Sequence, residues 1–178
     1  SEKYDTPVIL RTTTKLAHSQ SAVELCDRKE TTDKPYERQV PKYVMMPAMA
    51  VKRHVVVEDR IKALEEFANN SELNTEEINE NSEIGIITSG ISYMYAKEAL
   101  GENASYLKLG MVYPLPEKLI RDFAAKVDKL YVIEELDPVI EEHCKALGVE
   151  VIGKDIFTLL GEYTPTMIKS AILGETAP

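Results

Sequence analysis

The sequence predicts an α/β fold with an open, doubly wound and mostly parallel sheet. Residues 84–87 (IGII) form a short apolar run, which is typical of a strand buried on both faces. The polar turn 88–90 (TSG) follows this run and leads into a helical pattern. The same plan recurs after residues 106–111 and 130–133. Strands that alternate with helices indicate a parallel sheet, and right-handed crossovers place helices on both of its faces.

An extended N-terminal arm is predicted to precede this unit. Residues 6–14 (TPVILRTTT) favour a β-strand because they are rich in β-branched side chains. Residues 15–47 are polar, lack a clear period and contain several prolines, which favours an arm or linker. Two interpretations of the strand remain open. It adds to the edge of the later sheet, or it completes a domain outside this chain.

A helix and an acidic linker are predicted between the arm and the sheet. Apolar residues recur at helical spacing within residues 57–69, namely Val57, Ile61, Leu64 and Ala68. Residues 70–83 are acidic and rich in asparagine, so we expect a solvated linker there. The predicted division of the chain is therefore 1–50, 51–83 and 84–178.

Two further helices and a strand are predicted in the C-terminal part. A helix is expected at residues 117–127, with Pro116 at its first turn and one apolar face formed by Leu119, Ile120, Phe123, Ala124 and Val127. Residues 149–152 are predicted as a fourth strand. The last helix is expected to begin at Thr164, to bury Ile168 and Ile172, and to end at Gly174.

The helix that follows residues 130–133 has clear signals at both ends. Asp137 is a favourable N-cap residue, Pro138 suits the first helical position, and Gly148 is the expected stop. Cys144 falls on the apolar stripe of this helix, so we predict that it is a small core residue.

The composition excludes several classes of partner. Lys and Arg number 21 against 30 Asp and Glu, which gives a net charge of −9. Such an acidic chain repels nucleic acid and anionic membranes, so neither partner is predicted. No apolar run approaches the ~18 residues that a membrane span needs. Because nothing indicates secretion, Cys26 and Cys144 are expected to be a reduced cytoplasmic pair rather than a disulfide.

Ser89 and Gly90 are candidates for binding an anion. They lie where a buried strand passes into a helix, and free N–H groups at such a point can hold a negative charge. The glycine-rich nucleotide fingerprints G-x-G-x-x-G and G-x-x-x-x-G-K-[ST] are absent from the sequence. The alternative interpretation is therefore a tight turn with a helix cap.

Glu134 and Glu135 are candidates at the carboxyl end of the strand at residues 130–133. Ligands of open α/β sheets gather at that edge, and paired carboxylates can act as general acid and base. The other interpretation is a structural role, or an ion pair with a basic group on a neighbouring domain.

Lys52 and Arg53 form a basic spot with His54 that could contact a phosphate group. The alternative is an ordinary solvated cluster. The histidines His18, His54 and His143 lack metal-ligand spacing with cysteine or with one another. No nucleophile constellation is readable, so no catalytic residue and no metal site is predicted.

Several segments together resemble the alpha subunits of indolepyruvate ferredoxin oxidoreductase, a family of thiamine-diphosphate-dependent 2-oxoacid oxidoreductases. The segments span most of the chain: residues 6–19 (TPVILRTTTKLAHS), 34–36, 43–47 (YVMMP), 52–54, 84–93 (IGIITSGISY), 107–118 (LKLGMVYPLPEK), 129–138 (KLYVIEELDP) and 152–155. The resemblance implies that residues 1–50 contain the last strand of a truncated thiamine domain, and that residues 84–178 form a domain like the C-terminal domain of transketolase.

The resemblance also implies an activity for the whole subunit, of which this chain would be a fragment inactive alone. That activity is oxidative decarboxylation of arylpyruvates to aryl-acetyl-CoA, with electrons passed to ferredoxin. The family uses thiamine diphosphate, Mg²⁺, 4Fe-4S iron–sulfur clusters and CoA, none of which is expected to bind this fragment alone. The expected partners are other domains of the alpha subunit, a beta subunit and ferredoxin. The alternative function is a CoA-binding module of a related 2-oxoacid oxidoreductase.

Overall fold

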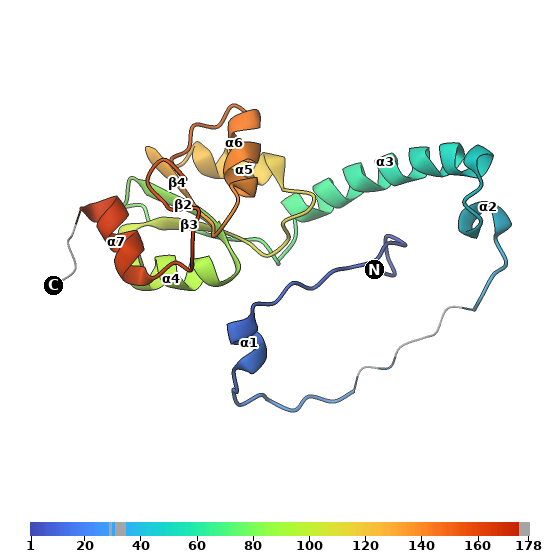
Figure 1. Ribbon diagram of the computed structural model, residues 1–178, viewed down its shortest axis with the longest axis horizontal. Coiled ribbons are helices and arrows are strands. Elements are labelled where there is room, and N and C mark those ends of the chain that lie inside the picture. The colour runs from blue at the N-terminus through green and yellow to red at the C-terminus, as the bar shows by residue number, and fades with distance from the viewer. Residues whose placement is uncertain (29, 31–34, 175–178) are drawn as a thin grey trace. The chain divides into compact units, whose positions relative to one another are not determined.

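The computed structural model describes residues 1–28, 30 and 35–174 (Figure 1). The chain divides into two compact units, Ser1–Arg60 and Ile61–Pro178. Within the described residues, no helix combines the length and the apolar character needed to cross a membrane.

The second unit contains a four-stranded sheet in the order β1-β3-β2-β4. Its strands are β1 (Thr75–Glu77), β2 (Ile84–Ser89), β3 (Ser105–Leu109) and β4 (Lys129–Ile133). Strand β2 pairs in parallel with β3 on one side and with β4 on the other. Strand β1 pairs antiparallel with β3 at one edge. The mostly parallel sheet predicted from the sequence is therefore confirmed.

Helices cover both faces of the sheet, as the doubly wound prediction requires (Figure 1). Neighbouring residues of β2 show the division, because Ile86 packs in one core and Ile87 in the other. The Ile86 core includes helices α4 (Gly90–Leu100) and α7 (Pro165–Leu173). The Ile87 core includes α5 (Glu117–Ala124) and α6 (Val139–Ala146). A short 3-10 helix, Gly101–Asn103, follows α4.

The predicted linker at residues 70–83 is wrong in part, because it contains β1. This strand is short and acidic, so its own pattern carries little strand signal. Its two glutamates are held by lysines of other elements: Glu76 by Lys126 at 2.7 Å and Glu77 by Lys97 at 2.6 Å. A short, charged edge strand of this kind resists pairing with another chain.

The predicted fourth strand at residues 149–152 is also wrong. Only one isolated bridge, between Tyr131 and Ile152, joins this segment to β4. The chain then turns away, and the backbone N–H of Lys154 donates to the Glu141 carboxylate at 2.8 Å. The layered unit therefore has three parallel strands rather than four.

The helix ends agree with the sequence in some places and differ in others. Helix α7 begins after the N-cap Thr164, whose side chain accepts from Met167 N at 3.2 Å, and it ends at Gly174, as predicted. Its Ile168 is buried and Ile172 is partly buried. Helix α5 is shorter than predicted and ends at Ala124.

The cap of α6 was predicted wrongly. Pro138, not Asp137, stands at the N-cap position, and the helix begins at Val139. A proline has no side-chain acceptor, so the first N–H groups of α6 need another partner. The side chain of Glu134 supplies it, as described below. Gly148 has φ 75°, which matches its predicted place just past the helix end, and Cys144 lies fully buried as predicted.

The first unit contains two short helices within the predicted N-terminal arm and the start of a longer one. No strand forms at residues 6–13 in the described chain, and α1 (Thr14–His18), capped by Thr13, follows them. The β-branched run has no neighbouring strand to pair with, so it stays extended and exposed. Helix α2 (Val40–Tyr43) follows. Helix α3 (Pro47–Asn69) starts ahead of the predicted residue 57, because proline is tolerated in a first turn.

Candidate functional site at the carboxyl edge of the sheet

The carboxyl ends of β2 and β4 carry the predicted site residues. Ser89 ends β2, Gly90 begins α4, and Glu134 follows β4 directly. The helix after β2 packs on one face of the sheet, and the helix after β3 packs on the other. Because the two connections leave the sheet on opposite faces, a crevice is expected between the carboxyl ends of β2 and β3, and open α/β sheets bind ligands at such topological switch points.

Glu134 is a buried cap of α6. Its two carboxylate oxygens accept from the backbone N–H groups of Ile140 and Glu141, both at 2.9 Å. Only 8% of the residue is exposed. Burial raises the pKa of Glu134, although the two N–H donors act in the opposite direction. Both oxygens are therefore occupied by the protein's own backbone.

Glu135 has a different partner. Its carboxylate accepts from the backbone N–H of Tyr163 at 2.8 Å, which ties the end of β4 to the loop before α7. The side chain is half-buried. Glu134 and Glu135 therefore serve separate backbone groups, and the structure does not bring them together as an acid–base pair.

Lys154 joins the same network from the loop after Ile152. Its ammonium donates to the backbone oxygen of Glu134 at 2.5 Å and to the hydroxyl of Tyr163 at 2.8 Å. The Tyr163 hydroxyl in turn donates to the backbone oxygen of Thr158 at 2.7 Å. Burial lowers the pKa of Lys154 against the attraction of nearby carboxylates. Burial likewise raises the pKa of Tyr163 to about 12.

Glu141 completes the network and was missed by sequence reasoning. Its carboxylate accepts from Lys154 N at 2.8 Å and from the Lys145 ammonium at 2.6 Å. A Cβ at Gly153 would lie under 3.0 Å from this carboxylate, so only glycine fits there without displacement. Glu141 looked like an ordinary polar helix residue, because Lys145 is a common i,i+4 partner and the partner that ties it to the later loop, Lys154, lies 13 positions further along the sequence.

Ser89 and Gly90 form the turn from β2 into α4, and anion binding there stays a prediction. Gly90 has φ 56°, in the left-handed region that favours glycine, and this turns the chain sharply into α4. The Ser89 side chain makes no capping hydrogen bond to α4. Next to it, the Thr88 hydroxyl donates to the backbone oxygen of Ile133 at 2.7 Å, which fixes the ends of β2 and β4 together.

The predicted phosphate contact belongs to the first unit. Lys52 and Arg53 lie on α3, where Lys52 is exposed and Arg53 is half-buried. His54 pairs with Glu58 on the same helix at 3.2 Å. The basic spot is therefore a turn of an exposed helix, and phosphate binding there stays a prediction.

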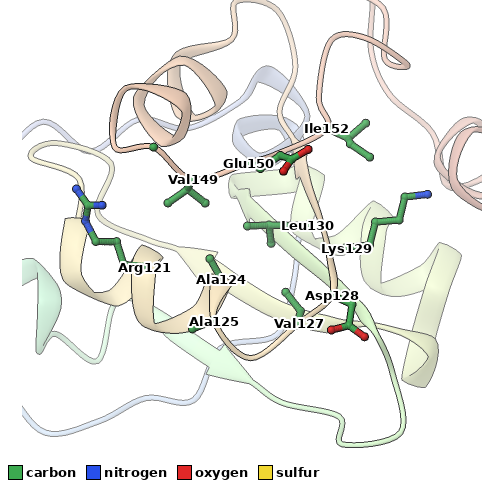
Figure 2. Close-up of a pocket in the computed structure, with 11 residues that line it drawn as sticks. Arg121, Ala124, Ala125, Val127, Asp128, Lys129, Leu130, Val149, Glu150 and Ile152 are labelled. Atoms are coloured by element: carbon green, nitrogen blue, oxygen red, sulfur yellow. The ribbon is translucent and has the colours of Figure 1, made fainter.

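A cavity of about 500 Å³ lies beside the start of β4, at the opposite end of this strand from Glu134 (Figure 2). Its walls come from the C-terminal part of α5 and the turn after it, the start of β4, and the segment from Gly148 to Ile152 that follows α6. Arg121 stands at one side and donates to the backbone oxygen of Leu147 at 2.5 Å. The cavity therefore reflects the incomplete pairing beside Leu130 and is separate from the candidate site.

The loops at the carboxyl edge are apolar as well as acidic. We call "the edge surface" a set of exposed side chains between β4 and the first residue of α6 and in the loop before α7, two segments joined by the hydrogen bond from Tyr163 to Glu135. Its apolar members are Leu136, Val139, Leu159 and Leu160, and its acids are Asp137 and Glu162. Leu160 is 81% exposed and Leu136 is 53% exposed. Leu136 also has φ 63°, an uncommon conformation for a residue other than glycine. Exposed apolar patches rimmed by polar residues are typical of contact surfaces.

No group of three or more metal-ligating side chains occurs among the residues that the structure describes. Two cysteines are present, with Cys26 exposed and Cys144 buried, and both are free thiols.

Comparison with known proteins gives a consistent relationship. The chain is 39% identical to the indolepyruvate oxidoreductase subunit IorA of Archaeoglobus fulgidus over 86% of its length. It is 39% identical to IorA of Methanothermobacter marburgensis over 99% of its length, and 36% identical to IorA of Pyrococcus abyssi over 97%. The chain is similar to a part of IorA subunits. It spans 26% to 31% of their length, so it corresponds to a part of them. No protein-family model matches the chain.

A solved structure shares the fold of this IorA-related chain. It is 2-oxoglutarate:ferredoxin oxidoreductase from Magnetococcus marinus with 2-oxoglutarate, coenzyme A and succinyl-CoA bound. The TM-score is 0.58 at 20% identity, and the match covers 73% of this chain and 24% of that one. The likeness confirms the predicted fold as one found within a 2-oxoacid:ferredoxin oxidoreductase.

Proposed function

We propose that this chain is an interaction domain within an indolepyruvate oxidoreductase, and that its carboxyl edge contacts other parts of that enzyme. In the proposed whole enzyme, arylpyruvates are decarboxylated oxidatively to aryl-acetyl-CoA and ferredoxin takes the electrons. The observation that carries the proposal is which side chains at the carboxyl edge of the sheet are bonded internally and which are exposed. Glu134 and Lys154 make hydrogen bonds within the chain, whereas Leu136, two positions after Glu134, is exposed.

The residues of this chain do not fit the cofactors that the family resemblance implies. A 4Fe-4S cluster needs four thiolates, and the sequence has 2 cysteines, one of them buried in a core. No group of three or more His, Cys, Asp or Glu side chains that could hold a metal ion occurs among the described residues. We therefore assign thiamine, metal and cluster binding to other parts of the proposed enzyme.

A CoA-binding module is the second candidate function, because the Magnetococcus marinus enzyme of the same fold binds coenzyme A. The charge at the carboxyl edge argues against it. CoA is polyanionic, and residues 134–139 contain only acidic charges. The ammonium of Lys154, which lies next to them, is already engaged by Glu134 and Tyr163.

Hydrogen exchange tests the proposed interaction role. The amides of residues 134–139 and 155–164 are measured in the isolated chain and in the complete oxidoreductase. We expect slower exchange in the complete enzyme at these loops, with little change at the exposed face of α4 around Met94 and Glu98. Equal exchange of the two loops in both samples would refute the proposal.

A ligand titration separates the two candidate functions. Added CoA is expected to leave the melting temperature of the isolated chain unchanged, since a ligand stabilises only a protein that binds it. A rise that is lost in the double variant Lys52→Ala, Arg53→Ala would favour the CoA module. Thiamine diphosphate with Mg²⁺ is expected to give no heat in calorimetry with the isolated chain.

A further inference from the structure

We propose that the partner of the edge surface presents an apolar patch rimmed by lysine or arginine. This inference rests on the proposed interaction role and adds the chemistry of the partner. Two properties of the edge carry it: an excess of carboxylates over cations, and exposed leucines among those carboxylates.

The excess of negative charge surrounds Lys154. Its pKa is pushed upward by four carboxylates, those of Glu134, Glu135, Asp137 and Glu141, although burial lowers it overall. Lys145 is the other cation in contact with this group, and it pairs with Glu141 at 2.6 Å. Two ammonium groups therefore face at least four carboxylates.

The surrounding loops add no cation. Residues 134–139 and 155–164 contain no lysine, arginine or histidine, whereas Asp155 and Glu162 add to the acids. Lys145 approaches Asp155 only to 3.9 Å while it pairs with Glu141. Carboxylates therefore outnumber cations in these loops, and a cationic rim on the partner would complement them.

The apolar component excludes a purely electrostatic contact. Leu136, Val139, Leu159 and Leu160 are exposed side chains that a partner would bury. Central apolar anchors with a polar rim are the usual anatomy of a protein interface. The acidic rim disfavours a second copy of the same surface, since like charges would meet. It also disfavours an RNA or a phosphate-bearing ligand.

The charge variant for the test is Asp137→Lys. Asp137 is exposed, and its side chain does not cap α6, because Glu134 does so. The fold should therefore survive the reversal. Leu160→Ala tests the apolar anchor, and the matched controls are Glu98→Lys and Met94→Ala on the exposed part of α4.

The experiment uses the complete oxidoreductase. Carbodiimide cross-linking joins carboxylates to lysines in direct contact, and we expect cross-links from Asp137 or Glu162 to lysines outside the 178-residue chain. Exchange protection of the edge loops should fall about tenfold in Asp137→Lys and weaken in high salt, while the controls keep it.

The outcomes distinguish the two proposals. Loops unprotected in the unmodified enzyme would overturn the interaction role itself. Loops that are protected, but show neither cross-links nor sensitivity to salt and to Asp137→Lys, would leave the interaction role standing and overturn the basic rim. Loss of protection in Leu160→Ala alone would point to an apolar partner without a cationic rim.

Discussion

The carboxylate of Glu134 accepts a hydrogen bond at 2.9 Å from the backbone N–H of Ile140, six positions further along the chain. The second carboxylate oxygen accepts from Glu141 N at the same distance. A strand-end carboxylate thus supplies the cap that Pro138 cannot provide. This placement explains why an acidic residue is buried at the edge of the sheet.

Replacement of Glu134 by glutamine is expected to destabilise the fold by about 1–2 kcal/mol. The amide keeps one acceptor oxygen but loses the charge that strengthens both bonds, and its NH₂ group faces a backbone donor. Urea unfolding followed by circular dichroism measures the change. Glu98→Gln, at an exposed position of α4, is the control and should have almost no effect. An unchanged midpoint for Glu134→Gln would contradict the capping role.

The apolar runs were sufficient to predict the layered architecture. Ile86 and Ile87 face opposite cores, so a run without alternation correctly indicated a strand covered on both sides. Strand β1 could not be found in this way, because Thr75–Glu77 is exposed and acidic and is held by pairing with β3. Tertiary pairing overrode the local signal there.

The candidate site was predicted only in its location. The position of Glu134 after a buried strand showed that it lies at the carboxyl edge. Its capping role depends on Pro138, rather than Asp137, standing at the N-cap position of α6. It also lies in a network with Lys154 and Tyr163, which come from a later part of the chain. Such long-range contacts leave no periodic signal in the sequence. The division into residues 1–50, 51–83 and 84–178 stays a prediction.

Two glycines are expected to respond differently to alanine. A Cβ at Gly110 would collide with the backbone oxygen of Leu73, whereas a Cβ at Gly153 would collide with the Glu141 side chain. A backbone segment yields less than a side chain, so Gly110→Ala should cost about 3 kcal/mol and Gly153→Ala about 1–2 kcal/mol. Chemical unfolding of both variants gives the comparison.

A double-mutant cycle isolates the contact at Gly153. In a Glu141→Ala background the colliding carboxylate is absent, so Gly153→Ala should cost less than in the unmodified chain. Additive effects of the two substitutions would contradict a direct collision. A smaller cost for Gly110→Ala than for Gly153→Ala would show that the loop at Leu73 can move.

Glu77 is expected to make the free energy of unfolding depend on pH in the acidic range. Hydrogen bonds from Lys97 and Tyr93 lower the pKa of Glu77 below its usual 4.5. A lowered pKa favours the folded state above pH 4.5, and this contribution is lost as the pH falls through the folded-state pKa. Because the pair is partly exposed to solvent, we expect only about 0.5 kcal/mol at neutral pH.

The variant Glu77→Gln tests this sign. Its stability deficit relative to the unmodified chain should be present at pH 7 and disappear as the pH falls below 4.5. Thermal unfolding across pH 3 to 7 gives the difference directly, with Glu98→Gln as a variant that should show no such trend. A deficit that grows toward acid would contradict the assignment.

The two thiols are expected to react at very different rates. Cys26 is exposed, whereas Cys144 is fully buried in the core against α5, and burial raises the pKa of the Cys144 thiol to about 12. At pH 8 a disulfide reagent should therefore modify one thiol per folded chain and a second one only after unfolding.

Cys26→Ser should leave the folded chain almost unreactive. In that variant the slow labelling rate reports opening of the core around α6, and it should rise in step with denaturant. Rapid labelling of Cys144 in the folded variant would show that the core between the sheet and α6 is open to solvent.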